Sequence, residues 1–213
     1  MKITILGAHG KIAMHMHHML VNNGHQVRGL IRKQEQSEDL KNLGVEPVIC
    51  DVEKEEDISE AVGNVDAVVF AAGAGPGSGA DRKWTVDRDG AVKLIEAAKK
   101  NGIDRYVMIS AMGLDEPRGS DVFQVYQKAK AEADEALRKS GLDYTIIKPG
   151  RLTDENGTGK VSLAPKLDPG EIPREDVATV LTKVLETPSL SGKTLDFISG
   201  DSTVDQAIKK VLE

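Results

Sequence analysis

The chain is poor in cysteine, aromatic residues and long hydrophobic runs, and each shortage excludes a class of protein. Cys50 is the single cysteine among 213 residues, so no internal disulfide can form and a reducing, cytoplasmic setting is expected. An aromatic content of 3% argues against stacking platforms for single-stranded nucleic acid, and a net charge of −6 argues against a general binder of phosphate backbones. No apolar run approaches the roughly 20 residues that span a bilayer, so a membrane role has no support.

The length and the remaining composition are those of an ordinary globular protein. With 39% hydrophobic and 29% charged residues, the chain can bury one well-formed core. No shift in composition marks a boundary between domains, and the N-terminus lacks the pattern of a secretory signal. We therefore expect one domain over residues 1–213, as a monomer or a small homo-oligomer.

A glycine motif near the N-terminus is the strongest functional signal. An apolar, β-branched run over residues 2–6 ends at Gly7, and Gly10 and Ala13 follow at intervals of three. In this G-x-x-G-x-x-A pattern, Gly7 would let the chain turn sharply, Gly10 would admit a pyrophosphate, and Ala13 would let helix and strand pack closely. The N–H groups at the start of the helix would then face the phosphates. A purely structural strand-to-helix turn is the alternative.

Apolar runs and helical stripes alternate along the chain. Strands are expected at residues 2–6, 25–31, 45–50, 65–72, 104–110, 144–148 and 193–199, and helices at about 11–22, 53–63, 83–101, 121–139, 173–186 and 204–212. This alternation is typical of a parallel sheet with right-handed crossovers and helices on both faces. The predicted fold is therefore α/β: a doubly wound, three-layer α/β/α sheet of the Rossmann type, with strand order 3-2-1-4-5-6-7 and the seventh strand at the edge.

Two segments lack a helical or strand period. Residues 151–172 are rich in Gly, Pro, Asp and Thr, and we expect an irregular cap, with a small hairpin at most, over the open end of the sheet. Residues 73–79 contain four glycines and follow a central strand. Because ligands bind at the carboxyl ends of parallel strands, we interpret this glycine-rich segment as a mobile rim of a cofactor cleft, with a plain flexible connector as the alternative.

The histidines offer a weaker signal. All five lie between His9 and His25, and His15 and His18 are three residues apart on the first predicted helix. Such a pair could share a metal ion, but no nearby carboxylate or cysteine completes a site. We therefore expect no metal.

The end of the second predicted strand bears on the choice of cofactor. In the dinucleotide-binding fold, an acidic residue at this place binds the ribose 2′-hydroxyl, whereas an arginine accommodates a 2′-phosphate. No Asp or Glu occurs from Val27 through Lys33, and Arg32 stands at the strand's end. The pattern predicts NADP, with NAD as a weaker ligand. A solvated strand end is the alternative.

Three more features complete a resemblance to a known family. Tyr126 and Lys130 form a Y-x-x-x-K pattern on a predicted helix, Ser110 ends the strand before it, and Pro149 and Gly150 follow the sixth strand. With the glycine motif, and in this order, they resemble the short-chain dehydrogenase/reductase superfamily. The likeness covers about residues 1–200 and is closest to the compact atypical branch, which is similar to NAD(P)-dependent epimerases/dehydratases, NmrA-like proteins and biliverdin/flavin reductases.

The resemblance implies roles for these residues. Residues four apart share a helix face, so the Lys130 ammonium is expected to approach the Tyr126 phenol and to lower its pKa from an unperturbed value of about 10. By the resemblance, Tyr126 exchanges a proton, Lys130 also bonds the nicotinamide ribose, and Ser110 orients a substrate carbonyl or alcohol. The alternative is a packing tyrosine and a solvated lysine. The cofactor-binding residues expected are Gly7, His9, Gly10, Lys11, Ile12, Arg32, Asp51, Val52, Ala71, Ala72, Gly73, Ser110, Lys130 and Pro149.

Two departures from the larger family narrow the expected function. Asp87 stands where an asparagine of the family's proton relay is often found, and about 60 residues follow Gly150, too few for a large sugar-nucleotide lobe. The leading hypothesis is an NADP(H)-dependent oxidoreductase that acts on a small substrate. An epimerase or dehydratase acting through transient oxidation is a second enzyme hypothesis. A non-catalytic NADP(H)-sensing regulator of the NmrA type, acting through a protein partner, is the alternative from another class.

Overall fold

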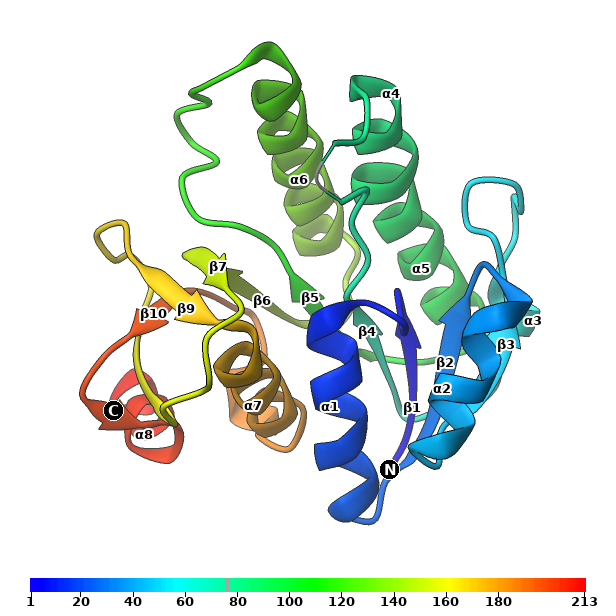
Figure 1. The fold of residues 1–213 in the computed structure, drawn as a ribbon, viewed down its shortest axis with the longest axis horizontal. Helices are drawn as coiled ribbons and strands as arrows, with labels where there is room; N and C mark the ends of the chain where they lie inside the picture. Colours follow the sequence, from blue (N-terminus) through cyan, green and yellow to red (C-terminus); the bar gives the residue numbers. More distant parts are fainter. Residues whose placement is uncertain (76) are drawn as a thin grey trace.

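A mixed sheet of nine strands lies between layers of helices in the computed structural model, which describes residues 1–75 and 77–213 (Figure 1). Its order is β11-β8-β10-β6-β5-β4-β1-β2-β3. The strands are β1 (Lys2–Leu6), β2 (Gln26–Ile31), β3 (Glu46–Ile49), β4 (Ala67–Phe70), β5 (Arg105–Ile109), β6 (Asp143–Pro149), β8 (Lys160–Ala164), β10 (Lys193–Ser199) and β11 (Ser202–Thr203). The pairings from β3 through β6 to β10 are all parallel.

The predicted strand order is confirmed, but the predicted edge is wrong. β10 pairs with β6 as the seventh strand of the order, and then β8 pairs antiparallel with β10 and β11 with β8. The strand β8 was expected to be irregular. Its residues Val161 and Leu163 alternate with polar neighbours, and both are buried, so one face of a short strand covers the core beyond β10.

Helices cover both faces of the sheet, as predicted. On one face α1 (Lys11–Asn22) and α7 (Arg174–Leu185) pack side by side over a core that includes Ile5, Val69 and Phe197. On the other, α3 (Ser59–Val62), α5 (Asp89–Lys100) and α6 (Asp121–Lys139) enclose a second core. The terminal helix α8 (Val204–Leu212) has the predicted bounds and begins with a capping box at Thr203.

Two predicted helices differ from the expectation, and further short helices were not expected. The predicted helix at 53–63 is reduced to α3, because residues 51–56 form turns tied by Lys93, whose Nζ donates to the carbonyls of Val52 and Glu55. The predicted helix at 83–101 consists of a π-helical turn η2 (Lys83–Arg88) and α5, and the short helix α4 (Ala80–Arg82) precedes it. The short helices η1 (Gln34–Gln36), α2 (Ser37–Asn42) and η3 (Pro188–Leu190) were not predicted.

The segment 151–172 has more regular structure than its composition suggests. Besides β8, it contains β7 (Arg151–Thr153) and most of β9 (Glu171–Pro173), which pair in parallel as a separate two-stranded sheet. The buried carboxylate of Asp176 in α7 accepts the N–H groups of Thr158 and Gly159 and so ties the segment to that helix.

Across the described residues 1–75 and 77–213, no helix has the length and apolar character needed to cross a bilayer.

Candidate functional site

The predicted site residues gather along one edge of the sheet. β3, β2, β1, β4, β5 and β6 are parallel neighbours, so their carboxyl ends form a continuous row. The expected cofactor contacts follow these ends: Gly7, His9, Gly10, Lys11 and Ile12 after β1, Arg32 after β2, Asp51 and Val52 after β3, Ala71, Ala72 and Gly73 after β4, Ser110 after β5, and Pro149 at the end of β6. The row is where open α/β sheets bind their ligands.

The turn between β1 and α1 is tightly built. Gly7 has a φ of +86°, and a Cβ at this position would lie 2.6 Å from the backbone of Ala72. The Gly10 N–H donates to the Gly7 carbonyl at 2.9 Å, and among residues 1–75 and 77–213 no side chain caps the start of α1. The helix therefore presents its first N–H groups at the open edge, which is the arrangement that binds phosphate. These residues fit a pyrophosphate.

A buried histidine of α1 hydrogen-bonds to the backbone of this turn. His17 of α1 is fully buried, and its Nε2 lies 2.7 Å from the carbonyl oxygen of Ala8. Burial lowers the pKa of His17, so the neutral ring donates from Nε2. The only sign of this role in the sequence is the position of His17 on the apolar side of the helix.

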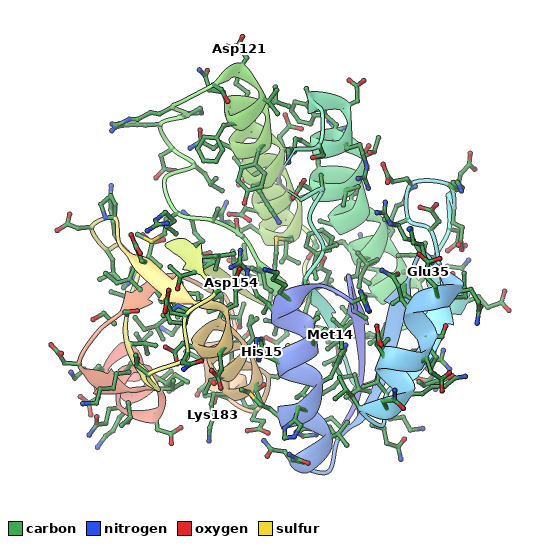
Figure 2. The ribbon with its side chains drawn as sticks, viewed as in Figure 1. Met14, His15, Glu35, Asp121, Asp154 and Lys183 are labelled. Carbon is green, nitrogen blue, oxygen red and sulfur yellow. The ribbon has the colours of Figure 1, made fainter. Side chains whose placement is uncertain are left out.

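The side chains of His9 and Lys11 turn toward neighbouring segments. His9 Nε2 lies 2.7 Å from Asp39 of α2, and Lys11 Nζ lies 2.6 Å from Asp154. Figure 2 shows Asp154 beside the start of α1, with His15 further along the helix. In this arrangement the backbone of the glycine turn faces the open edge, while the side chains of His9 and Lys11 line a groove of about 640 Å³ beside the first half of α1.

A carboxylate that the sequence did not reveal lies beside Arg32. Glu53 Oε2 is 3.9 Å from Arg32 Nη1, and it is held more closely by Arg82, at 2.6 Å from Nη2. The absence of acidic residues from Val27 through Lys33 therefore does not leave the end of β2 free of negative charge. Glu53 comes from the turn after β3, and only the folded sheet brings it here.

Within the described part of the chain, Lys130 makes no hydrogen bond to the Tyr126 phenol and no cation–π contact with its ring. Its Nζ donates to the Ile109 carbonyl at 3.1 Å and lies 3.6 Å from Asp87 Oδ1, while Phe70 offers a ring face at 5.0 Å. The ion-pair partner of this lysine is thus Asp87, the residue found where the resemblance led us to expect an asparagine.

The prediction of a lowered pKa for Tyr126 is wrong. Burial raises the pKa of Tyr126, and the negative charges of Asp87 and Asp134 raise it further. Lys83 Nζ lies 5.6 Å from the centroid of the Tyr126 ring and donates to the Gly75 carbonyl. The phenol is therefore protonated near neutral pH, which suits a proton donor better than a base.

Ser110 and Asp134 form the rest of this polar cluster. Ser110 is buried, and its Oγ has no partner with ordinary hydrogen-bond geometry among the described residues. Asp134 is buried four residues beyond Lys130 on the same face of α6, and burial raises the pKa of its carboxyl group, although the neighbouring Ser110 hydroxyl and Lys130 oppose the rise. The spacing of Tyr126, Lys130 and Asp134 at intervals of four could have indicated this third member.

Comparisons with known proteins agree with this geometry. The uncharacterized sugar epimerase YhfK of Bacillus subtilis is 38% identical, with 99% of this chain and 100% of that protein covered. Among solved structures, a proposed NAD-dependent epimerase/dehydratase from Bacillus halodurans is 38% identical, with a TM-score of 0.94 over 99% of this chain and 100% of that one. The oxidoreductase ylbE from Lactococcus lactis is 30% identical, with a TM-score of 0.88 over 100% and 97%.

The glycine turn and the row of strand ends lie inside the region that a family model matches. The family is described as NAD(P)H-binding, and its match runs over residues 7–188, from the first glycine of the turn to the end of α7 and just beyond. The chain belongs to this NAD(P)H-binding family.

Proposed function

We propose that the protein is an NADP(H)-dependent oxidoreductase that acts on a small substrate. The observation that carries the proposal is the position of buried Ser110 after β5, in the same row of strand ends as the glycine turn, with buried Lys130 bonded to the Ile109 carbonyl and Tyr126 one turn earlier on α6. A hydroxyl, a phenol and an ammonium in this arrangement fit the reduction of a carbonyl or a related acceptor.

The cofactor would lie along the carboxyl ends of the strands. The backbone of Gly7 and Gly10 and the start of α1 would hold the pyrophosphate, and Arg32 would hold the 2′-phosphate. When bound, the cofactor supplies or accepts a hydride. The Lys130 ammonium would face the nicotinamide ribose from its place between Ile109 and Asp87.

Tyr126 would supply the proton. Because its pKa is raised, the phenol keeps its proton at neutral pH and can donate it to a developing alkoxide. The Ser110 hydroxyl, which has no partner of ordinary geometry among the described residues, would hydrogen-bond the substrate oxygen.

An epimerase acting through transient oxidation is a second candidate, and the similarity to the uncharacterized sugar epimerase of Bacillus subtilis favours it. The same tyrosine would remove and return a proton in that reaction. The comparisons do not favour the regulator of the NmrA type, since the similar proteins are described as an epimerase, an epimerase/dehydratase and an oxidoreductase.

The experiment compares Tyr126→Phe with the matched variant Tyr144→Phe. NADPH oxidation is followed with panels of aldehydes, ketones, quinones and flavins, and sugar nucleotides are tested separately for epimerisation. We expect Tyr126→Phe to lose about 10²–10⁴-fold in turnover with aldehydes and ketones while NADPH binding survives, because general acid catalysis contributes this much. Tyr144→Phe should keep its activity. Equal turnover in the two variants would refute the role of Tyr126, and an inert panel with tight NADPH binding would refute the enzyme.

A further inference from the structure

Two arginines and a threonine converge on one carboxylate beside the end of β2. Arg82 donates to both oxygens of Glu53, from Nη2 at 2.6 Å and from Nε at 3.2 Å, and Thr85 Oγ1 donates at 2.8 Å. Arg32 Nη1 lies 3.9 Å away, at the limit of an ion pair. The Glu53 carboxylate is therefore engaged by Arg82 and Thr85, and Arg32 is only loosely attached to it.

The position of Glu53 does not depend on Arg82 alone. Its backbone N–H donates to Asp51 Oδ1 at 3.2 Å, and Lys93 Nζ donates to the carbonyls of Val52 and Glu55 at 2.7 and 2.6 Å. This fixed turn keeps the carboxylate next to the end of β2. If the Arg82 side chain were removed, Glu53 would remain within reach of Arg32.

A free carboxylate at this place would act on the two dinucleotides in opposite ways. It would repel a 2′-phosphate and compete with it for Arg32, since like charges a few ångströms apart repel strongly near a protein surface. It would also offer an acceptor to the 2′-hydroxyl of NAD. While Arg82 and Thr85 hydrogen-bond to the Glu53 carboxylate, both its repulsion of a 2′-phosphate and its capacity to bind the 2′-hydroxyl of NAD are reduced.

We propose that Arg82 is a positioning residue for cofactor specificity: by engaging Glu53, it leaves Arg32 available for the 2′-phosphate and so sets the preference for NADP over NAD. The inference rests on the proposed cofactor site and adds a residue to it. Arg82 acts through Glu53 and makes no contact of its own with the phosphate. Hydrogen bonding from Arg82 also lowers the pKa of Glu53, so the carboxylate that it neutralises is charged at neutral pH.

The test is a double-mutant cycle in which the affinity for each dinucleotide is measured. Affinities for NADP⁺ and NAD⁺ are measured by calorimetric titration of the wild type, Arg82→Ala, Glu53→Gln and the double variant. We expect Arg82→Ala to lower the ratio of NADP⁺ to NAD⁺ affinity about tenfold, the scale of one charge-assisted contact. Glu53→Gln should raise that ratio. In the double variant, the loss seen in Arg82→Ala should disappear, because the competing carboxylate is gone.

Lys54→Ala is the matched control. It removes one positive charge from the same turn, but Lys54 is 82% exposed and pairs with Asp51 at 3.2 Å, not with Glu53. The affinity ratio should stay at the wild-type value in this variant.

Other results would contradict either the role of Arg82 or the proposed function. A double variant as weak for NADP⁺ as Arg82→Ala would overturn the proposal, since Arg82 would then bind the phosphate directly. Equal losses of affinity for NADP⁺ and NAD⁺ in Arg82→Ala would also overturn the proposal. Arg82 would then only hold α4 to the turn after β3. If the wild type binds neither dinucleotide, the proposed function fails. If the wild type binds them and the ratio of NADP⁺ to NAD⁺ affinity is unchanged in all variants, only the role of Arg82 is refuted.

Discussion

Lys130 Nζ and Asp87 Oδ1 lie 3.6 Å apart, and both side chains are almost fully buried, at 4% and 1% exposed. The pair joins α6 to η2 behind the end of β5. Asp87 Oδ2 also accepts the Ala74 N–H at 3.1 Å, so the same carboxylate holds the start of the glycine-rich segment. The charge of Lys130 is therefore balanced by the Asp87 carboxylate.

Removing one member of this pair should destabilise the fold. We expect Asp87→Asn to lower the free energy of unfolding by about 3 kcal/mol, because it leaves a buried ammonium without its counter-charge. Asp89→Asn, whose carboxylate pairs with the partly exposed Arg88, should cost less than about 1 kcal/mol. Urea unfolding measures both. In the double variant of Asp87→Asn and Lys130→Met, part of the loss should be recovered, and equal losses for Asp87→Asn and Asp89→Asn would contradict the assignment.

The elements that local sequence determines were predictable. The run ending at Gly7, the alternation of strands and helices, and the stripe of α6 each follow from periods of two or 3.6 residues and from glycine at a turn. The contacts of Glu53 and Asp87 with distant basic residues could not be predicted from local sequence. Glu53 reaches Arg32 only because β2 and β3 are neighbours, and Asp87 reaches Lys130 across two helices, so their effects depend on tertiary packing that no local pattern records.

Gly7 and Gly24 provide a matched pair for testing the tight turn. Both have a positive φ, of +86° and +79°, but a Cβ would meet Ala72 at Gly7 and nothing within 4 Å at Gly24. Gly24→Ala should cost about 1–2 kcal/mol from the backbone conformation alone. Gly7→Ala should cost more and should also abolish dinucleotide binding, because the turn must shift. Thermal unfolding and NADP⁺ titration check both effects, and equal behaviour of the two variants would refute the steric argument.

Cys50 should be unreactive in the folded protein. It is 5% exposed, and burial, followed by the charge of Glu55, raises the pKa of its thiol to about 12. At pH 8 the thiolate fraction should be about 10³-fold below that of an ordinary cysteine, and the thiolate is the reactive form. Labelling with Ellman's reagent should be slow in buffer and rapid in guanidinium chloride. Since this is the single cysteine, rapid labelling of the native protein would contradict the assignment directly.

The stability of the protein should fall in mild acid because of His17. Burial lowers the pKa of His17 from 6.5, so between the lowered value and 6.5 the unfolded chain binds a proton that the folded chain does not. The free energy of unfolding should therefore decrease as pH falls below about 6.5, by at most about 1.4 kcal/mol per pH unit from this group. His17→Met should remove this part of the slope, while also losing the hydrogen bond to the Ala8 carbonyl. The exposed His15 gives the control. Urea unfolding of wild type, His17→Met and His15→Met at pH 7.5, 6.5 and 5.5 measures the three slopes, and a wild-type slope in His17→Met would show that the buried ring does not control acid stability.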